Sequence, residues 1–157
     1  MRRYGFAEAV ALSEMLLIVR LDIFKMGCVF DRHPLNDSII IGTYSEPFDP
    51  LADSYTAAEY LLDALKNSFT TMYYVADMRQ LKVSFSDVMI GLDTAYKTPG
   101  SPYKHPNLKT FTVATDELIK MGAIAAAQQM QYGQSDVMFY HNIDEALKEI
   151  IMQVGKG

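Results

Sequence analysis

The sequence predicts a single α/β domain built on a mainly parallel central sheet, and three observations support this fold class. The chain has 157 residues, a length that suits one domain. Half of its residues are hydrophobic, enough to bury a sizeable core. Short apolar runs of strand length alternate with longer segments of helical periodicity. This alternation indicates parallel strands with helices packed on the sheet.

The expected domain begins with a β-hairpin. Residues 29–30 and 38–44 are apolar runs, and the turn-forming segment 33–37 separates them. Three further strands are expected at residues 72–77, 108–115 and 137–140, where apolar and β-favouring side chains cluster. We therefore expect an antiparallel pair at the start of the sheet, followed by strand–helix repeats.

Capping residues mark where the helices between these strands should begin. The expected N-caps are Asp49, Ser84, Asp116 and Asn142. The inward faces are expected at Leu51, Tyr55, Ala58, Leu62 and Leu65 of the first of these helices. In the second they are expected at Phe85, Val88, Met89 and Leu92.

Residues 1–26 form a separate N-terminal extension in this interpretation, and residues 27–157 form the α/β domain. Apolar residues recur at helical spacing between residues 6 and 24, which predicts a helix with an apolar face to cover. Charged residues interrupt the segment, so a membrane-spanning helix is not expected. We expect the apolar face to contact protein, with a homodimer as one form of that contact.

Composition argues against several classes of function. The net charge is 14 − 19 = −5, so the basic footprint of a nucleic-acid binder is missing. Cys28 is the single cysteine, which excludes a disulfide within the chain and argues against a cysteine-based zinc site. Neither a metal nor a cofactor is expected, and a reducing, cytoplasmic location fits the cysteine usage.

Polar residues that follow the strands indicate where a functional site would lie. In open α/β sheets, ligands bind beyond the carboxyl ends of the strands. This edge should collect Asp77 and Arg79 after one strand, Asp116 after the next and His141 after the last. Ser84 and Ser86 join them at the start of a helix. Structural roles, above all helix capping, are the alternative interpretation for these side chains.

The chain resembles the STAS superfamily, the anti-sigma-factor antagonist-like (SpoIIAA-like) domains that share features with SEC14-like lipid-binding modules. The resemblance rests on the opening strand 38–44, the segment 74–79, in which a strand ends in Asp77, and the closing segments 137–140 and 144–147. Classical members carry an Asp-Ser-Ser-Gly-like segment whose serine is phosphorylated by a partner kinase. Here the matching stretch is 83–87, with Ser86 near the phospho-acceptor position, and the signature itself is not reproduced.

Three hypotheses for function follow. The first is a non-enzymatic regulatory or protein-interaction domain, as the STAS resemblance implies, that binds a protein partner at the strand-end edge. The second is a small-molecule or lipid-binding module whose pocket lies beneath that edge and is lined by methionine and tyrosine. The third is an enzyme that uses His141 with Asp77 or Asp116, because a histidine titrates near neutral pH. No phosphate-binding glycine motif or nucleophile elbow is present in the sequence.

Overall fold

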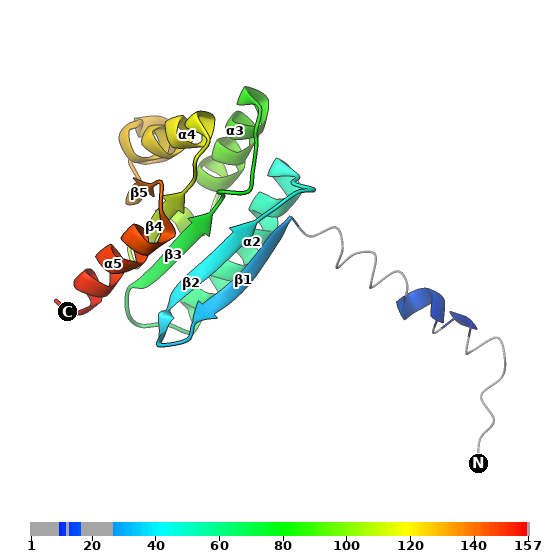
Figure 1. Cartoon of the computed structure of the whole chain (residues 1–157), viewed down its shortest axis with the longest axis horizontal. Coiled ribbons are helices and arrows are strands. Elements are labelled where there is room, and N and C mark those ends of the chain that lie inside the picture. The colour runs from blue at the N-terminus through cyan, green and yellow to red at the C-terminus, as the bar shows by residue number, and fades with distance from the viewer. Residues whose placement is uncertain (1–9, 12, 17–26, 157) are drawn as a thin grey trace, which may run out of the picture.

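The computed structural model describes residues 10–11, 13–16 and 27–156, and it contains a five-stranded mixed sheet (Figure 1). The strands are β1 (Cys28–His33), β2 (Asn36–Tyr44), β3 (Met72–Asp77), β4 (Leu108–Val113) and β5 (Val137–Tyr140). They lie side by side in chain order, with β1 antiparallel to β2 and all other pairs parallel. The α/β class predicted from the sequence is confirmed.

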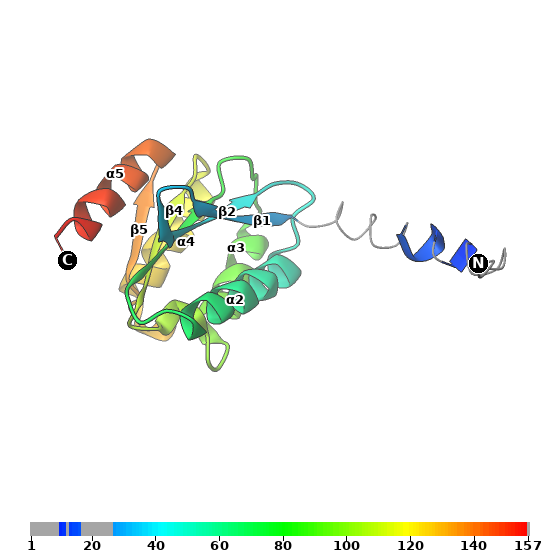
Figure 2. The same ribbon diagram turned by 90° about the horizontal axis from the view of Figure 1, so that it is seen from below.

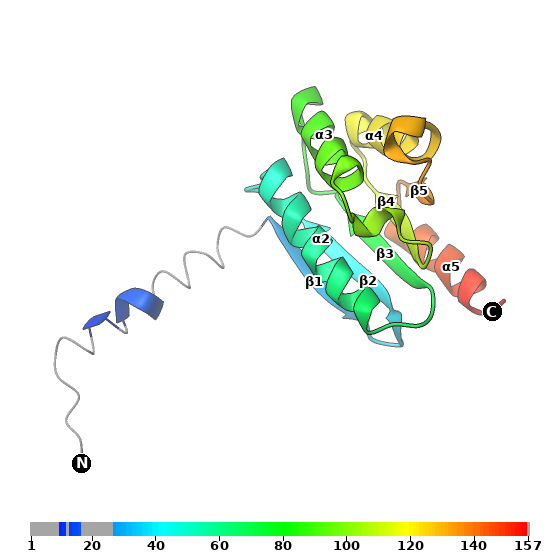
Figure 3. The same cartoon turned by 180° about the vertical axis from the view of Figure 1, so that it is seen from behind.

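Within residues 27–156, four α-helices pack on this sheet. They are α2 (Pro50–Lys66), α3 (Phe85–Leu92), α4 (Glu117–Gln128) and α5 (Ile143–Val154). Figures 2 and 3 show α2, α3 and α4 side by side on one face of the sheet, whereas α5 lies on the other. Each of the three parallel crossovers therefore passes over the same face, and only the final helix crosses to the opposite side.

The predicted helix starts are confirmed. Asp49 accepts hydrogen bonds from the backbone N–H groups of the first turn of α2, and the side chain of Asp116 does the same in α4. Ser84 and Asp87 form a reciprocal capping box at α3. Asn142 caps α5 through the N–H of Asp144. These bonds satisfy N–H groups that have no partner inside a helix.

The hairpin is also confirmed, although both of its strands extend beyond the predicted apolar runs. Pairing runs from Cys28 opposite Tyr44 to Arg32 opposite Ile40, and the register shifts at His33. Residues 31–33 are polar and therefore carry little strand signal in the sequence. Polar side chains are compatible with pairing here because β1 is an edge strand, and one side of an edge strand faces water.

The inward faces predicted for two helices were wrong in part. In α2 the buried apolar residues are Ala57, Leu61, Ala64 and Leu65, of which only Leu65 was predicted, whereas Leu51 and Tyr55 are exposed. The buried face is therefore rotated around the helix axis, with two alanines facing the sheet. In α3 no residue is fully buried, and Phe85 at its start is exposed.

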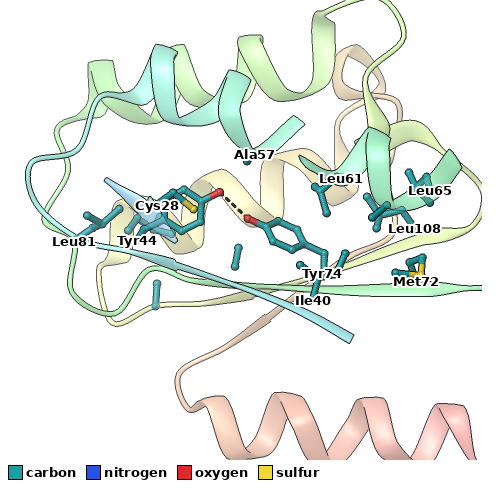
Figure 4. Close-up of a cluster of buried hydrophobic side chains, with 14 residues drawn as sticks. Cys28, Ile40, Tyr44, Ala57, Leu61, Leu65, Met72, Tyr74, Leu81 and Leu108 are labelled. Atoms are coloured by element: carbon teal, nitrogen blue, oxygen red, sulfur yellow. Dashed lines mark hydrogen bonds between the residues drawn. The ribbon is translucent and has the colours of Figure 1, made fainter. Parts of the chain in front are cut away.

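The two faces of the sheet carry separate cores. Beneath α5, the buried residues are Ile39, Tyr73, Val75, Phe111, Val113, Ala146 and Ile150. Beneath α2, α3 and α4, the buried cluster includes Cys28, Ile40, Tyr44, Leu61, Met72, Tyr74 and Ala114 (Figure 4). Side chains of β3 reach both cores because neighbours along a strand point to opposite faces.

The predicted N-terminal helix over residues 6–24 lies mostly outside the described residues. Residues 10–11 and 13–16 are helical, and Val10, Met15 and Leu16 are exposed. The proposed division at residue 26 falls outside the described part of the chain. Among the helices that the structure describes, none has the length and apolar character needed to cross a membrane.

Candidate functional site

A cavity of about 120 Å³ lies between the sheet and the layer formed by α2, α3 and α4. Its floor comes from β2, β3 and β4, and its roof comes mainly from α3 and α4. The lining side chains are mostly apolar or aromatic. They include Tyr44, Phe48, Tyr74, Ala76, Met78, Leu81, Val83, Val88, Leu92, Tyr96, Tyr103, Thr110, Thr112, Ile119, Ala123 and Ala126.

Tyrosine hydroxyls supply much of the polarity of this cavity. The hydroxyl oxygens of Tyr44 and Tyr74 are 2.6 Å apart and share a buried hydrogen bond, and Figure 4 shows the two rings pointing at each other. The Tyr103 ring packs between Tyr74 and Tyr96, with ring centroids 6.2 and 5.2 Å away. Aromatic side chains thus form a continuous wall on one side of the space.

Burial keeps these groups uncharged. Desolvation raises the pKa of Tyr44 and Tyr74 well above the ordinary phenol value, and it also raises the pKa of Tyr96 and Tyr103. Burial raises the pKa of the neighbouring Cys28 thiol to about 12. All five groups therefore stay protonated at neutral pH, and the phenols remain able to donate hydrogen bonds.

Small residues leave room for the cavity and for its tyrosines. A Cβ atom on Gly42 would lie 2.7 Å from the Tyr74 hydroxyl, so only glycine leaves this hydroxyl in place beside β2. On α4, a Cβ atom on Gly122 would lie 2.9 Å from Cγ1 of Val88, so the missing side chain brings α3 and α4 close together. Ala76 and Ala123 add little volume on the floor and roof.

At the strand-end edge, Asp77 and Arg79 form a tight ion pair. Nε and Nη2 of Arg79 each donate to a carboxylate oxygen of Asp77 at 2.8 Å, and the Arg79 backbone N–H also donates to Asp77. Burial alone would raise the pKa of Asp77, but the contacts with Arg79 outweigh burial and lower this pKa. The carboxylate is thus occupied within its own loop and does not line the cavity.

Ser84 and Ser86 lie at the start of α3, on the same edge. The Ser84 hydroxyl accepts from the N–H of Asp87 at 3.1 Å, and the Asp87 carboxylate accepts from the N–H of Ser84 at 2.8 Å. Ser84 therefore serves as a helix cap. Ser86 is exposed and follows the exposed Phe85.

Asp116 and His141 follow the next two strands, as predicted, and each has a local contact. Asp116 accepts from the N–H of Leu118 at 2.8 Å, and His141 is exposed with its ring edge-on to Phe139. Within the described residues, neither a hydrogen bond nor an ion pair joins His141 to Asp77 or Asp116. The same part of the chain contains no cluster of three or more metal-ligating side chains of His, Cys, Asp or Glu.

Sequence reasoning found the edge but missed most residues of the cavity. None of the six candidates (Asp77, Arg79, Ser84, Ser86, Asp116 and His141) lines the cavity, whereas Asp87, beside Ser86, does. A pocket lined by tyrosine and methionine was expected. The structure provides four tyrosines and one methionine, Met78. One indication of the cavity was visible in the sequence. Thr110 and Thr112 alternate with Phe111 and Val113, which places the two threonines on the same face of the strand.

Comparisons of this chain with family models, curated proteins and solved structures found no match.

Proposed function

We propose that this protein is a non-enzymatic binding module that holds a small, largely apolar molecule between its sheet and helices α2–α4. One observation carries the proposal: a partly open cavity of about 120 Å³ between sheet and helices, lined by aromatic and aliphatic side chains with a few hydroxyls. Small-molecule sites are typically concave and apolar with a small number of placed polar groups. A well-packed interior normally leaves few voids larger than a water molecule.

The roof of the cavity supports the proposal. Helix α3 has no fully buried residue, and Val88, Gly91 and Leu92 on it line the space. A helix held by few buried contacts opens at a lower free energy than the core does. It therefore gives a ligand a way in without unfolding of the sheet.

Thermal unfolding of the full chain with toluene as an apolar probe tests this function. We expect toluene to raise the melting temperature, because a ligand that binds only the folded state stabilises it. Ala123→Leu on α4 fills the cavity and should abolish the increase. Ala127→Leu changes the same helix by the same volume at a half-buried position outside the lining, and it should keep the increase. The proposal fails if toluene leaves the wild-type melting temperature unchanged.

A regulatory protein-interaction domain, as the STAS resemblance implies, is the second candidate. The observation that favours it is the start of α3, where Phe85 is 59% exposed beside the exposed Ser86. An apolar side chain next to an exposed hydroxyl on the strand-end edge suits a partner contact that phosphorylation controls. Phe85→Ala and Ser86→Asp should leave the toluene effect intact. A pull-down from cells in which only the wild type recovers a defined partner would support this role.

A further inference from the structure

Two threonine hydroxyls in the cavity have no hydrogen-bond partner among the residues that the structure describes. Thr110 and Thr112 belong to β4 and are only 4% and 7% exposed. They alternate with Phe111 and Val113, which pack beneath α5, so both threonine side chains face the cavity. Among the described residues, neither hydroxyl donates or accepts a hydrogen bond. Hydroxyls that line a cavity without a protein partner are available to bond to a polar atom of a ligand, so these two groups point to such an atom.

The surface left on these hydroxyls opens into the cavity. Within the described residues, no side-chain nitrogen or oxygen is both fully covered and without a partner. The two threonine oxygens, which have no partner, therefore keep some accessible surface, and the cavity is the space they line. The hydroxyls of Tyr44 and Tyr74 differ because they already bond to each other.

The threonines lie close to the tyrosines on the cavity floor. Thr110 pairs with Tyr74 across the parallel β3–β4 ladder, and Thr112 pairs with Ala76. Along β4 the two threonine Cα atoms are about 6.6 Å apart from strand geometry. The floor therefore presents two open hydroxyls along one strand, beside the small side chain of Ala76. A ring that lies over Ala76 would be within reach of both hydroxyls.

The charge of the lining selects against ionised ligands. Among the described residues, the lining contains no lysine, arginine or histidine. Its one carboxylate, Asp87, is held at the start of α3 by the N–H of Ser84. An anionic group in this space would lose its hydration without gaining a cation, which is strongly unfavourable. A cationic group would find only the Asp87 carboxylate in the lining, and this carboxylate already accepts a backbone hydrogen bond.

The volume limits the size of the ligand. An apolar cavity of about 150 Å³ engineered in another protein binds benzene. The cavity of about 120 Å³ in this chain is of similar size and therefore suits a single ring. Resting on the proposed function, we infer that the bound molecule is neutral, of single-ring size, and carries a hydroxyl, carbonyl or amide group that hydrogen-bonds to Thr110 and Thr112.

Titration of the full chain with toluene, phenol and benzoate at pH 7, followed by NMR, tests this inference. Toluene and phenol have the same number of heavy atoms, so their difference isolates the hydrogen bond. We expect phenol to bind roughly 3- to 10-fold more tightly than toluene, and more tightly than benzoate. Toluene binding at least as tight as phenol, or benzoate binding at least as tight as phenol, would overturn the inference.

Isosteric variants locate the effect. Thr110→Val and Thr112→Val should each weaken phenol binding by roughly 3- to 10-fold while leaving toluene binding equal or tighter. Thr43→Val on β2 is the matched control, because it makes the same change in a strand at a position outside the lining. If phenol binds wild type and both variants equally, the threonine contact is wrong although the binding function stands. If neither toluene nor phenol binds, both this inference and the proposed function are wrong.

Discussion

The two faces of the sheet differ in how many helices cover them and in how completely they are filled. One helix, α5, covers one face, and the side chains there are apolar or aromatic with fully buried Phe111 and Ile150. Three helices cover the other face, yet a cavity remains beneath them. More covering structure has therefore not produced tighter packing, and the face with more helices is the one with room for a ligand.

The composition of the two faces explains this difference. Beneath α5, large residues meet large residues, as in the stacked pair Phe111 and Tyr140 with ring centroids 6.0 Å apart. Beneath α3 and α4, the sheet offers Ala76 and the threonines, and the helices offer Gly91, Gly122 and Ala123. Small residues on the sheet and on the helices leave a void unless the two backbones approach each other. The tyrosines along one wall hold the sheet and the helices apart.

Removing a side chain from the filled face should have the largest effect. Phe111→Ala should lower the free energy of unfolding by about 3–5 kcal/mol, because the lost ring leaves a cavity that its neighbours cannot close. Val88→Ala, at a half-buried position on the cavity, should cost about 1 kcal/mol or less. Urea denaturation followed by far-UV circular dichroism measures both values. Equal losses for the two variants would mean that the faces are equally packed.

Two glycine-to-alanine changes should have opposite signs. In Gly42→Ala the new Cβ atom would lie 2.7 Å from the Tyr74 hydroxyl and 3.1 Å from Cε1 of Phe30. We expect a loss of about 1–3 kcal/mol as Tyr74 is displaced from Tyr44. Gly91→Ala in α3 has its nearest neighbour 3.9 Å away, at Oγ of Ser54. It should stabilise by about 0.5–1 kcal/mol through helix propensity. Destabilisation by Gly91→Ala would show that the cavity face is already full.

The sequence predicted those parts of the fold that depend on local contacts. The caps at Asp49, Ser84 and Asp116 were found because each bond joins residues two or three positions apart. The hairpin was found from its turn. The buried face of α2 was predicted wrongly in part. Ala57 and Leu61 are buried because their side of the helix packs against the sheet, and the local sequence pattern does not encode how closely a helix approaches a sheet.

The candidate site was harder to predict because it depends on which face each helix covers. The positions of Asp77, Asp116 and His141 along the strand-end edge were correct, since each follows a predicted strand. The capping role of Asp116 was predicted, whereas the contact of Arg79 with Asp77, which occupies that carboxylate, was not. The cavity required knowing that α2, α3 and α4 share one face. Thr110 and Tyr74, which are separated in sequence, become neighbours through the pairing of β3 with β4.

Alkaline pH should destabilise the domain through Cys28, which is buried beneath α2, α3 and α4. The folded state holds the proton of Cys28 up to a pKa of about 12, whereas the unfolded thiol releases it near 9.0. Since the unfolded state then binds fewer protons, stability is full below about pH 8 and falls as pH rises. Between pH 8 and 10 this thiol should account for a loss of about 1 kcal/mol. Cys28→Ala should reduce the pH dependence of urea denaturation by that amount, and an unchanged dependence would contradict it.

Phe69, in the α2–β3 connection, should show the smallest effect and gives the sharpest contrast with Phe111. It is 99% exposed, whereas Phe111 is 0% exposed. Phe69→Ser should therefore change the free energy of unfolding by less than about 0.5 kcal/mol, because a side chain already in water loses no burial. Leu35→Ser in the hairpin turn, also highly exposed, is the matched control. A loss of several kcal/mol for Phe69→Ser alone would show that this phenylalanine is covered in solution. If that loss of stability depends on protein concentration, the covering group is a second copy of the chain. If it does not depend on concentration, the covering group is another segment of the same chain.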